Sequence, residues 1–481
     1  VEALFVKFNN HPAPPKVGVT AAESGTYTDF ANISLGGVLP DGTDGSSEMT
    51  WLLLDVIEEM HLLQPSTNLQ LASVTPDAVL ARALQVIRRG YGFPSLFNAD
   101  MVVAEQLRVG KSIEDARAGG CSGCVETSAF GKESCVLTGY FNLPKVLELV
   151  LHDGVDPRTG ERLLTAGGVD PGAGEDFESL YGAFELGLAE VLEVKLAGNA
   201  IIERMYAESM PAPFLSLLVD DCVRNARDYN AGGARYHNRY VQMVGIGTIT
   251  DSLSAIRQLV YEEGRIGLVD LVRSLDRDFE GAESLRQRLV NRVPRWGNDD
   301  DRADDLMARV FESAVRLVDG RPSETDGRYR VQMLPTTCHV YFGSVTGATP
   351  DGRRAGRPLS EGISAVQGTD RLGPTAMLRS AAKMDHRMTG GTLLNMKLTP
   401  ALLEGDEGIE DISQLVRGYF RLGGHHIQFN VVEAETLRAA RAEPEQWRDL
   451  IVRVAGYSDY FCDLSPALQE EIIERTEHRA V

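Results

Sequence analysis

Hydrophobic and polar positions alternate between helical and strand-like spacing along most of the chain. Apolar residues recur every three to four positions between Thr75-Pro76 and Gly90, which predicts a helix that is capped by the threonine and ends at the glycine. Shorter helices are predicted to begin at Ser112 and at Ser465-Pro466, because serine caps helix N-termini and proline suits the first helical turn. Alternating helices and strands are typical of an α/β architecture.

Three further segments have a distinct local composition. Residues 214–219 form a short apolar run, which predicts a buried strand. Residues 153–175 are rich in Gly, Pro and Asp and are interpreted as a surface loop. The five aspartates between Asn298 and Asp305 predict the solvated start of a helix. A metal site is disfavoured there, because side chains that follow one another in sequence point apart.

The composition is that of a folded protein, and the net charge limits the classes of molecule that the protein is expected to bind. Of the 481 residues, 43% are hydrophobic and 24% charged, which allows a large core and excludes a disordered chain. A net charge of −21 predicts no nucleic acid and no anionic membrane as partner. Six cysteines are too few for an extracellular disulfide framework and indicate reduced thiols in the cytoplasm. No apolar run reaches the roughly 20 residues of a membrane span.

A glycine-rich stretch at residues 119–126 contains two cysteines and an acid. The single Cys-x-x-Cys pair, Cys121 and Cys124, does not complete a zinc site, and its helix signals precede it, unlike those of a thioredoxin-like motif. The flanking glycines predict a tight loop in which Cys124 and Glu126 share a face, because they are two positions apart. Either a thiol lies beside a proton-transferring group, or a buried cysteine adjoins a surface glutamate.

A second glycine in an unusual place lies within residues 453–461. Gly456 interrupts a segment that would otherwise form a strand, which indicates a turn or a close backbone approach. Gly123-Cys124-Val125-Glu126 and residues 453–458 together resemble the cysteine loop and the glycyl radical loop of the glycyl radical enzymes. Further stretches that resemble this family, in the same order along the chain, are residues 245–248, 349–359 and 423–430.

The resemblance implies a fold and a division into domains. Members of the family have an α/β barrel of about ten strands in two halves, surrounded by helices. By this resemblance, residues 1–350 form the C-terminal part of the pyruvate formate-lyase-like barrel domain with the cysteine loop, and residues 351–481 form the glycine radical domain. Family members are longer at the N-terminus, and this chain begins with Val1, so we expect an N-terminal portion to be missing.

The resemblance also implies radical chemistry. Gly456 would store a glycyl radical installed by an activating enzyme that uses S-adenosylmethionine, and the chain would bind no cofactor and no metal. Cys124 would receive the radical as a thiyl, and Glu126 would transfer protons. The expected partners are a small-molecule substrate, the activating enzyme and a second copy of the chain in a homodimer. A non-catalytic spare radical domain is the alternative, although such proteins are shorter and lack the cysteine loop.

Within the family, the Cys-x-Glu pattern resembles eliminases and decarboxylases rather than acyl-transferring members, which carry two adjacent cysteines. The surrounding stretches most resemble members that dehydrate trans-4-hydroxy-L-proline to 1-pyrroline-5-carboxylate. This implies that Ser24 binds the substrate carboxylate, that Phe30 packs on its ring, and that Tyr140 and Thr336 lie at the pocket. Plain turn, core or strand roles remain open for these four residues. The alternative activities are decarboxylation of an aryl-acetate such as 4-hydroxyphenylacetate, or another Cys-x-Glu lyase reaction.

Overall fold

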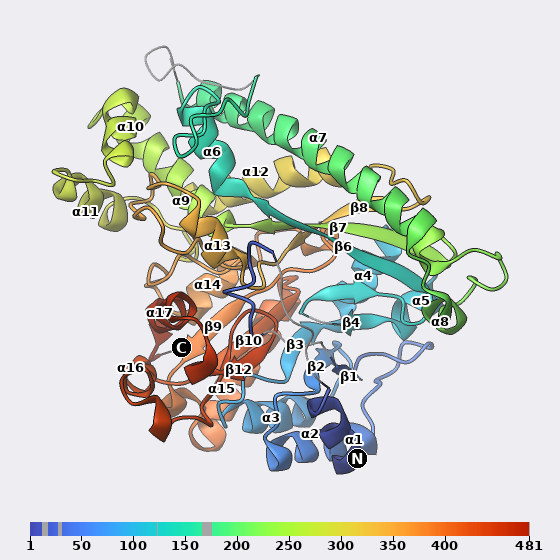
Figure 1. The fold of residues 1–481 in the computed structure, drawn as a ribbon. Helices are drawn as coiled ribbons and strands as arrows, with labels where there is room; N and C mark the ends of the chain where they lie inside the picture. The colour runs from blue at the N-terminus through green and yellow to red at the C-terminus, as the bar shows by residue number, and fades with distance from the viewer. Residues whose placement is uncertain (12–17, 27–30, 123, 166–175, 481) are drawn as a thin grey trace.

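Helices and strands alternate in the structure, a computed structural model that describes residues 1–11, 18–26, 31–122, 124–165 and 176–480. This alternation confirms the predicted α/β class (Figure 1). The strands are β1 Asn32–Gly36, β2 Ser66–Leu71, β3 Ser95–Asn98, β4 Gly120–Ser122, β5 Glu126–Ser128, β6 Glu133–Asn142, β7 Tyr236–Val244, β8 Arg328–Met333, β9 Asn395–Leu398, β10 His426–Val431, β11 Ile451–Arg453, β12 Ser458–Tyr460 and β13 Glu477–His478. The helices are α1 Glu2–Asn9, α2 Glu48–Met60, α3 Asp77–Ile87, α4 Ala99–Arg108, α5 Ile113–Ala118, α6 Leu143–Leu151, α7 Phe177–Ser209, α8 Pro213–Leu218, α9 Ile246–Ile256, α10 Leu268–Asp276, α11 Glu283–Asn291, α12 Asp301–Val318, α13 Cys338–Ser344, α14 Pro374–Ala381, α15 Gly405–Arg421, α16 Ala434–Ala442 and α17 Pro466–Glu474.

Two sheets form the wall of the molecule. Six strands pair in the order β1-β2-β3-β10-β9-β13, and three pair in the order β6-β7-β8. Neighbouring strands are parallel except β3 and β10, which are antiparallel. The backbone of β8 also bonds the segment that leads into β9: Gly390 N donates to Val331 O over 2.8 Å, and Leu393 N donates to Met333 O over 3.0 Å. The two sheets are therefore continuous around one interior.

The two faces of these strands differ in polarity. On β7, Val241 and Met243 belong to the main apolar core, which they share with residues of α9 and α12. Tyr240 and Gln242 alternate with them and so point to the opposite, inner face. Figure 1 shows the helices α6, α7 and α12 on the outer side of the three-stranded sheet. Helices thus cover an apolar outer face and leave a polar interior.

Two β-hairpins occupy that interior. The first joins β4 to β5, and in Figure 1 β4 lies between the three-stranded sheet above it and strands β1–β3 below it. The second joins β11 to β12. Each hairpin is bonded to a strand of the wall: Asn68 of β2 donates to the Cys121 carbonyl over 2.9 Å, and Asn430 of β10 donates to the Arg453 carbonyl over 2.7 Å. The wall strands thereby fix the position of both hairpins.

The helices that the sequence predicts from their caps are confirmed, with a small shift in one boundary. α3 begins at Asp77, slightly later than predicted, because the Thr75 hydroxyl accepts a hydrogen bond from a backbone N–H upstream of the helix instead of capping it. Ser112 and Ser465 are the N-caps of α5 and α17, and each accepts a hydrogen bond from the backbone N–H three residues later.

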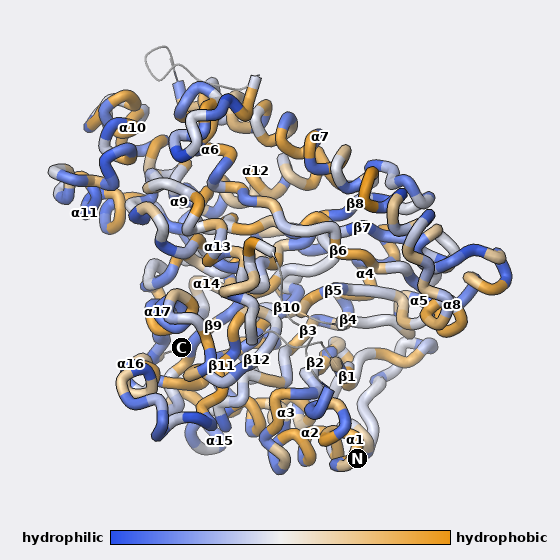
Figure 2. The backbone as a smooth tube through the Cα atoms, viewed as in Figure 1, coloured by the Kyte–Doolittle hydropathy of each residue, from blue (hydrophilic) through white to orange (hydrophobic). Residues whose placement is uncertain are grey.

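The buried strand predicted for residues 214–219 is wrong. The segment forms the helix α8, in which no side chain is buried, and Phe214 is 75% exposed. Pro213 at the first turn presets the helical φ, and the Ser216 hydroxyl donates to the Ala212 carbonyl over 2.9 Å. Figure 2 shows this hydrophobic helix at the edge of the molecule. An apolar run therefore indicated neither burial nor extended backbone here.

The remaining local predictions concern two loops and the domain boundary. The aspartate-rich stretch starts α12, with Asp300 as its N-cap, as predicted. It is not solvated throughout, because Asp304 is fully buried and pairs with Lys383. Residues 153–165 form turns and short bridges, and 166–175 lie outside the described residues. The boundary at residue 350 falls between α13 and α14, yet β9 and β10, which follow it, pair in one sheet with β1–β3. The division into two domains stays a prediction.

Candidate active site

The cysteine loop is the tip of the β4–β5 hairpin. Pairing of Ser122 with Glu126 closes the hairpin, which leaves Cys124 and Val125 at the turn. Cys124 is only 3% exposed, and Val125 is fully buried. The thiol is therefore held inside the barrel, where water is excluded.

Glu126 folds back onto the loop that carries the thiol. Its Oε2 accepts hydrogen bonds from the backbone N–H of Cys124 at 2.8 Å and of Val125 at 3.2 Å. Burial raises the pKa of the Glu126 carboxyl, although these backbone donors oppose the shift. Burial, and after it the charge of Glu126, holds the pKa of the Cys124 thiol well above its usual range. The sulfur therefore keeps its hydrogen, beside a carboxyl that is able to give or take a proton.

Gly456 lies in a two-residue turn at the tip of the β11–β12 hairpin. Val454 N donates to Tyr457 O over 2.8 Å, which closes the turn around Ala455 and Gly456. The φ angle of Gly456 is +88°, a backbone conformation that glycine adopts at little cost. All four residues of the turn are buried. The turn therefore needs a glycine at this position, independently of any chemistry.

The tips of the two hairpins are in contact. A Cβ built on Gly456 would lie 2.9 Å from the Cα of Cys124, and closer still to the Cβ and Sγ of the same residue. No side chain fits in that space, so the Cα of Gly456 faces the thiol directly. The fold thus brings together the two loops that lie far apart along the chain.

Thr336 and Tyr140 form a hydrogen-bonded pair near the thiol. Tyr140 Oη donates to Thr336 Oγ1 over 2.7 Å. Thr336 lies close enough to the Cys124 thiol to lower its pKa against the larger effect of burial. Thr336 follows β8 with a φ of +49°, a strained value for a β-branched residue. Burial raises the pKa of Tyr140, which keeps it a phenol. Both residues lie beside the thiol; their contact with substrate stays a prediction.

The other two predicted substrate residues belong to the N-terminal segment. The Ser24 hydroxyl donates to the Thr20 carbonyl over 2.6 Å, a turn-like contact, and no hydrogen bond among the described residues joins it to the cysteine loop. The nearby Thr26 lies close enough to Tyr457, in the glycyl turn, to lower its pKa against the larger effect of burial, so this segment reaches the site. Phe30 lies outside the described residues. The roles of Ser24 and Phe30 stay predictions.

Sequence reasoning missed the side chains that hold the glycyl hairpin in the barrel. Asn395 and Asn430 donate to backbone carbonyls of the hairpin, over 3.0 Å and 2.7 Å. Gln428 accepts a hydrogen bond from Arg453 Nε at 2.7 Å. A signal for them exists in the sequence: polar and apolar residues alternate regularly in 426–431, which indicates a strand with one polar face.

A second buried acid lies behind the cysteine loop. Glu105, on α4, accepts a hydrogen bond from the Thr127 hydroxyl of β5. Burial raises the pKa of Glu105 to about 7, against the opposing charge of Lys111. This carboxyl therefore titrates at a higher pH in the folded protein than in the unfolded chain.

We expect the free energy of unfolding to fall as the pH rises from 4.5 to about 7, because in that window the folded state holds the Glu105 proton that the unfolded chain has lost. The contribution is at most about 3 kcal/mol. Glu105→Gln keeps an acceptor for Thr127 and removes the titration, so its unfolding free energy depends less on pH. Urea unfolding of the unsubstituted protein and of Glu105→Gln, at pH values below and above this window, measures how strongly each unfolding free energy depends on pH. The same pH dependence in both proteins would contradict the prediction.

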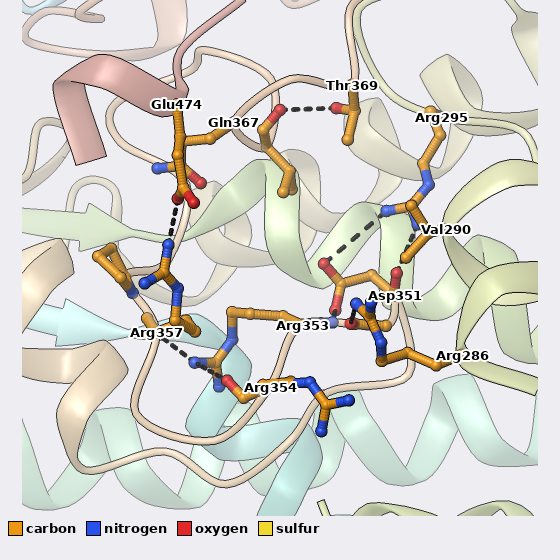
Figure 3. A pocket seen from close by; sticks show the side chains of 13 residues that line it. Arg286, Val290, Arg295, Asp351, Arg353, Arg354, Arg357, Gln367, Thr369 and Glu474 are labelled. Carbon is orange, nitrogen blue, oxygen red and sulfur yellow. Dashed lines mark hydrogen bonds and ion pairs between the residues drawn. The ribbon is translucent and has the colours of Figure 1, made fainter. Parts of the chain in front are cut away.

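Residues 349–359 build a separate loop beside an arginine-lined pocket (Figure 3). The buried Arg353 guanidinium donates to backbone carbonyls of this loop, among them those of Arg354 and Arg357. Arg357 in turn pairs with Glu474. These arginines are bonded within the protein, so we interpret the stretch as structural.

Neither a metal-binding cluster nor a membrane-spanning helix is present among the described residues. In this part of the chain, no three His, Cys, Asp or Glu side chains are grouped so that they could hold a metal ion. None of the helices described is both long enough and apolar enough to cross a bilayer. The six cysteines are free thiols.

Comparisons with known proteins identify the family. The family model "Pyruvate formate lyase-like" matches residues 1–343, and the model "Glycine radical" matches residues 359–462. A glycine radical domain implies a glycyl radical that an activating enzyme generates. The chain is 51% identical over 477 residues to trans-4-hydroxy-L-proline dehydratase of Clostridioides difficile, with 99% of this chain and 60% of that protein covered. It is 33% identical to (2S)-3-sulfopropanediol dehydratase of Klebsiella oxytoca, with 99% and 58% covered.

A solved structure supports the same assignment. The crystal structure of hydroxyproline dehydratase from Clostridioides difficile, with trans-4-hydroxy-L-proline bound, matches this chain with a TM-score of 0.97 and 50% sequence identity. The match covers 99% of this chain and 60% of the chain in that crystal structure. The predicted barrel fold is thereby confirmed. This chain spans about three-fifths of the length of the curated relatives it matches. With a family model over most of its length and a barrel that brings a glycine turn against a cysteine loop, the chain belongs to the pyruvate formate lyase-like family of glycyl radical enzymes.

Proposed function

We propose that this protein acts as a glycyl radical dehydratase, which removes water from trans-4-hydroxy-L-proline to give 1-pyrroline-5-carboxylate. The observation that carries the proposal is the contact between Gly456 and Cys124 inside the barrel. The substrate is supported by 51% identity to a hydroxyproline dehydratase and by the similarity to the structure with that substrate bound.

The cycle begins with radical transfer between the two loops. The radical on Gly456 Cα takes the hydrogen atom of the Cys124 thiol, so that a C–H bond forms and a thiyl radical remains. This exchange requires a neutral thiol, which the raised pKa of Cys124 supports. The thiyl then removes a hydrogen atom from the ring carbon next to the substrate nitrogen.

Loss of water follows, with Glu126 as the proton-transferring group. The C–O bond on the neighbouring carbon breaks, and the leaving hydroxyl takes a proton from the Glu126 carboxyl. The ring nitrogen then returns a proton to the carboxylate, and the radical moves to the carbon that carried the hydroxyl. That carbon takes a hydrogen atom back from Cys124, and the thiyl recovers its own from Gly456. The raised pKa of Glu126 supports its role as an acid.

The finer assignments belong to the same proposal. The radical on Gly456 is installed by an activating enzyme that uses S-adenosylmethionine, and the protein works as a cytoplasmic homodimer. Tyr140 and Thr336 line the pocket, which their hydrogen bond to each other and their position near the thiol support. Ser24 and Phe30 contact the substrate, as the resemblance implies.

The test is activation of the full-length protein under anaerobic conditions, followed by addition of trans-4-hydroxy-L-proline. We expect a glycyl radical signal in electron paramagnetic resonance, and pyrroline-5-carboxylate trapped as its coloured aldehyde adduct. A radical without this product would overturn the substrate, and aryl-acetates would then test the decarboxylase alternative. Absence of any radical would contradict the role of Gly456.

Glu126→Gln is expected to lower turnover by about 10²–10⁴-fold while the radical yield is unchanged. The amide oxygen still accepts hydrogen bonds from the Cys124 and Val125 backbone, so the loop is preserved, but the side chain no longer transfers a proton. Product per radical, counted by electron paramagnetic resonance, measures the effect. Glu105→Gln is the matched control, because Glu105 is also a buried acid but does not hydrogen-bond the backbone of Cys124 or Val125. Unchanged turnover per radical in Glu126→Gln would remove the carboxyl from the mechanism.

A further inference from the structure

Arg453, the residue at the end of β11, is a buried cation whose partners among the described residues are all neutral. It is 1% exposed. Its guanidinium donates to Gln428 Oε1 at 2.7 Å, to Ser95 Oγ at 2.7 Å and to Ser458 Oγ at 3.4 Å. Among the described residues it has no carboxylate partner within ion-pair distance. Burying a cation costs free energy of desolvation, which a neighbouring anion would offset in part. Burial of Arg453 among neutral partners therefore indicates a specific role for this side chain.

The guanidinium joins the glycyl hairpin to the barrel wall. Ser95 lies on β3 and Gln428 on β10, the two antiparallel neighbours of the six-stranded sheet. Gly92, just before β3, leaves room for the hairpin: a Cβ there would lie 2.7 Å from the Cβ of Arg453. The charge of Arg453 also lowers the pKa of the Cys124 thiol against the larger effect of burial, so the cation lies near the cysteine loop. One side chain thus spans the wall, the glycyl turn and the cysteine loop.

We propose that Arg453 is a positioning residue that sets how deeply the glycyl hairpin inserts into the barrel, and that its neutral partners keep this insertion reversible. The inference rests on the proposed function, since it concerns a radical on Gly456. Gly456 is sealed against Cys124, so an activating enzyme reaches its Cα only when the hairpin moves outward. An arginine that leaves the barrel regains its hydration, which offsets the lost hydrogen bonds. A buried ion pair would oppose the same movement.

Two substitutions are expected to act in opposite directions. Arg453→Met removes the anchor, so the radical is installed at least as fast, but turnover per radical falls about 10²-fold, because the hairpin tip is misplaced relative to Cys124. Gln428→Glu gives Arg453 an anion at the bond it already makes, so radical installation slows several-fold. Arg453→Lys, which keeps the charge, is expected to restore part of the turnover.

Electron paramagnetic resonance supplies a readout that a merely structural role would not change. In deuterium oxide, the thiol of Cys124 carries deuterium, and reversible transfer delivers it to Gly456. The splitting from the glycyl α-hydrogen then collapses. We expect this collapse to be fast in the unsubstituted protein and slow in Arg453→Met, at equal radical content.

A second variant and a control guard against loss of folding. Ser95→Ala removes one hydrogen bond to Arg453 and is expected to lower turnover per radical several-fold. The control is Arg417→Lys: Arg417 is 8% exposed and donates to the Ala72 and Thr75 carbonyls over 2.9 Å and 2.5 Å, so its replacement lowers stability alone.

Three results separate the possible failures. Unchanged deuterium exchange and turnover in Arg453→Met and Ser95→Ala would overturn the positioning role. A normal rate of radical installation in Gln428→Glu would overturn the reversible insertion. Failure of the unsubstituted protein to form a radical would overturn the proposed function, and the inference with it.

Discussion

Replacing Cys124 by serine is expected to abolish turnover while the glycyl radical still forms. The O–H bond of serine is much stronger than the S–H bond of cysteine, so a glycyl radical does not abstract its hydrogen. The serine hydroxyl is also smaller than the thiol and fits under Gly456 without displacing the hairpin. The loss in product formation is expected to be at least about 10⁴-fold. Product and radical content of Cys124→Ser and the unsubstituted protein, after identical activation, measure it.

Cys121→Ser provides the matched control for this prediction. Cys121 lies in the same hairpin and is fully buried, but it is paired opposite Thr127 and does not face Gly456. We expect this variant to keep its turnover per radical. In deuterium oxide, the α-hydrogen of the glycyl radical should exchange in Cys121→Ser and persist in Cys124→Ser. Product above background in Cys124→Ser would exclude the thiol as the hydrogen-abstracting group.

Gly456→Ala is expected to remove the radical and to loosen the glycyl hairpin. The φ of +88° is strained for alanine by about 1–3 kcal/mol. The new methyl group would also collide with Cys124, whose Cα lies 2.9 Å from its position. The hairpin tip must therefore move away from the thiol. We expect no glycyl signal after activation and a lower midpoint in urea unfolding.

Gly418→Ala separates this effect from a general response to alanine. Gly418 lies in the helix α15, and a Cβ there meets no neighbour within 4 Å. Alanine is the better helix former, so this variant is expected to be as stable as the unsubstituted protein or slightly more stable. A normal glycyl signal in Gly456→Ala would show that another residue carries the radical.

Local patterns were enough to predict helices whose ends are marked by short-range contacts. Ser112 and Ser465 cap helices because the hydrogen bond that the hydroxyl oxygen accepts from a backbone N–H three residues later depends on nothing else in the fold. The prediction of a buried strand at residues 214–219 was wrong because it depended on contacts that the local sequence does not determine. Whether an apolar side chain is buried depends on what packs against it, and α8 is an exposed helix.

Some features of the candidate site were also predictable from local sequence, and others depend on the tertiary structure. Glycines around Cys124 and a glycine in a strand-like segment at residue 456 are local features, and the two loops indicated the family through their resemblance to known motifs. The sequence of either loop does not predict that the Gly456 Cα lies against the thiol or that the Glu126 carboxyl accepts hydrogen bonds from the backbone of its own loop. It also does not predict that Arg453 has neutral partners among the described residues. These features arise where strands far apart in the sequence enclose one interior. Periodicity in a sequence reports which face of an element is buried, whereas the partner of that face is selected by the packing of the whole chain.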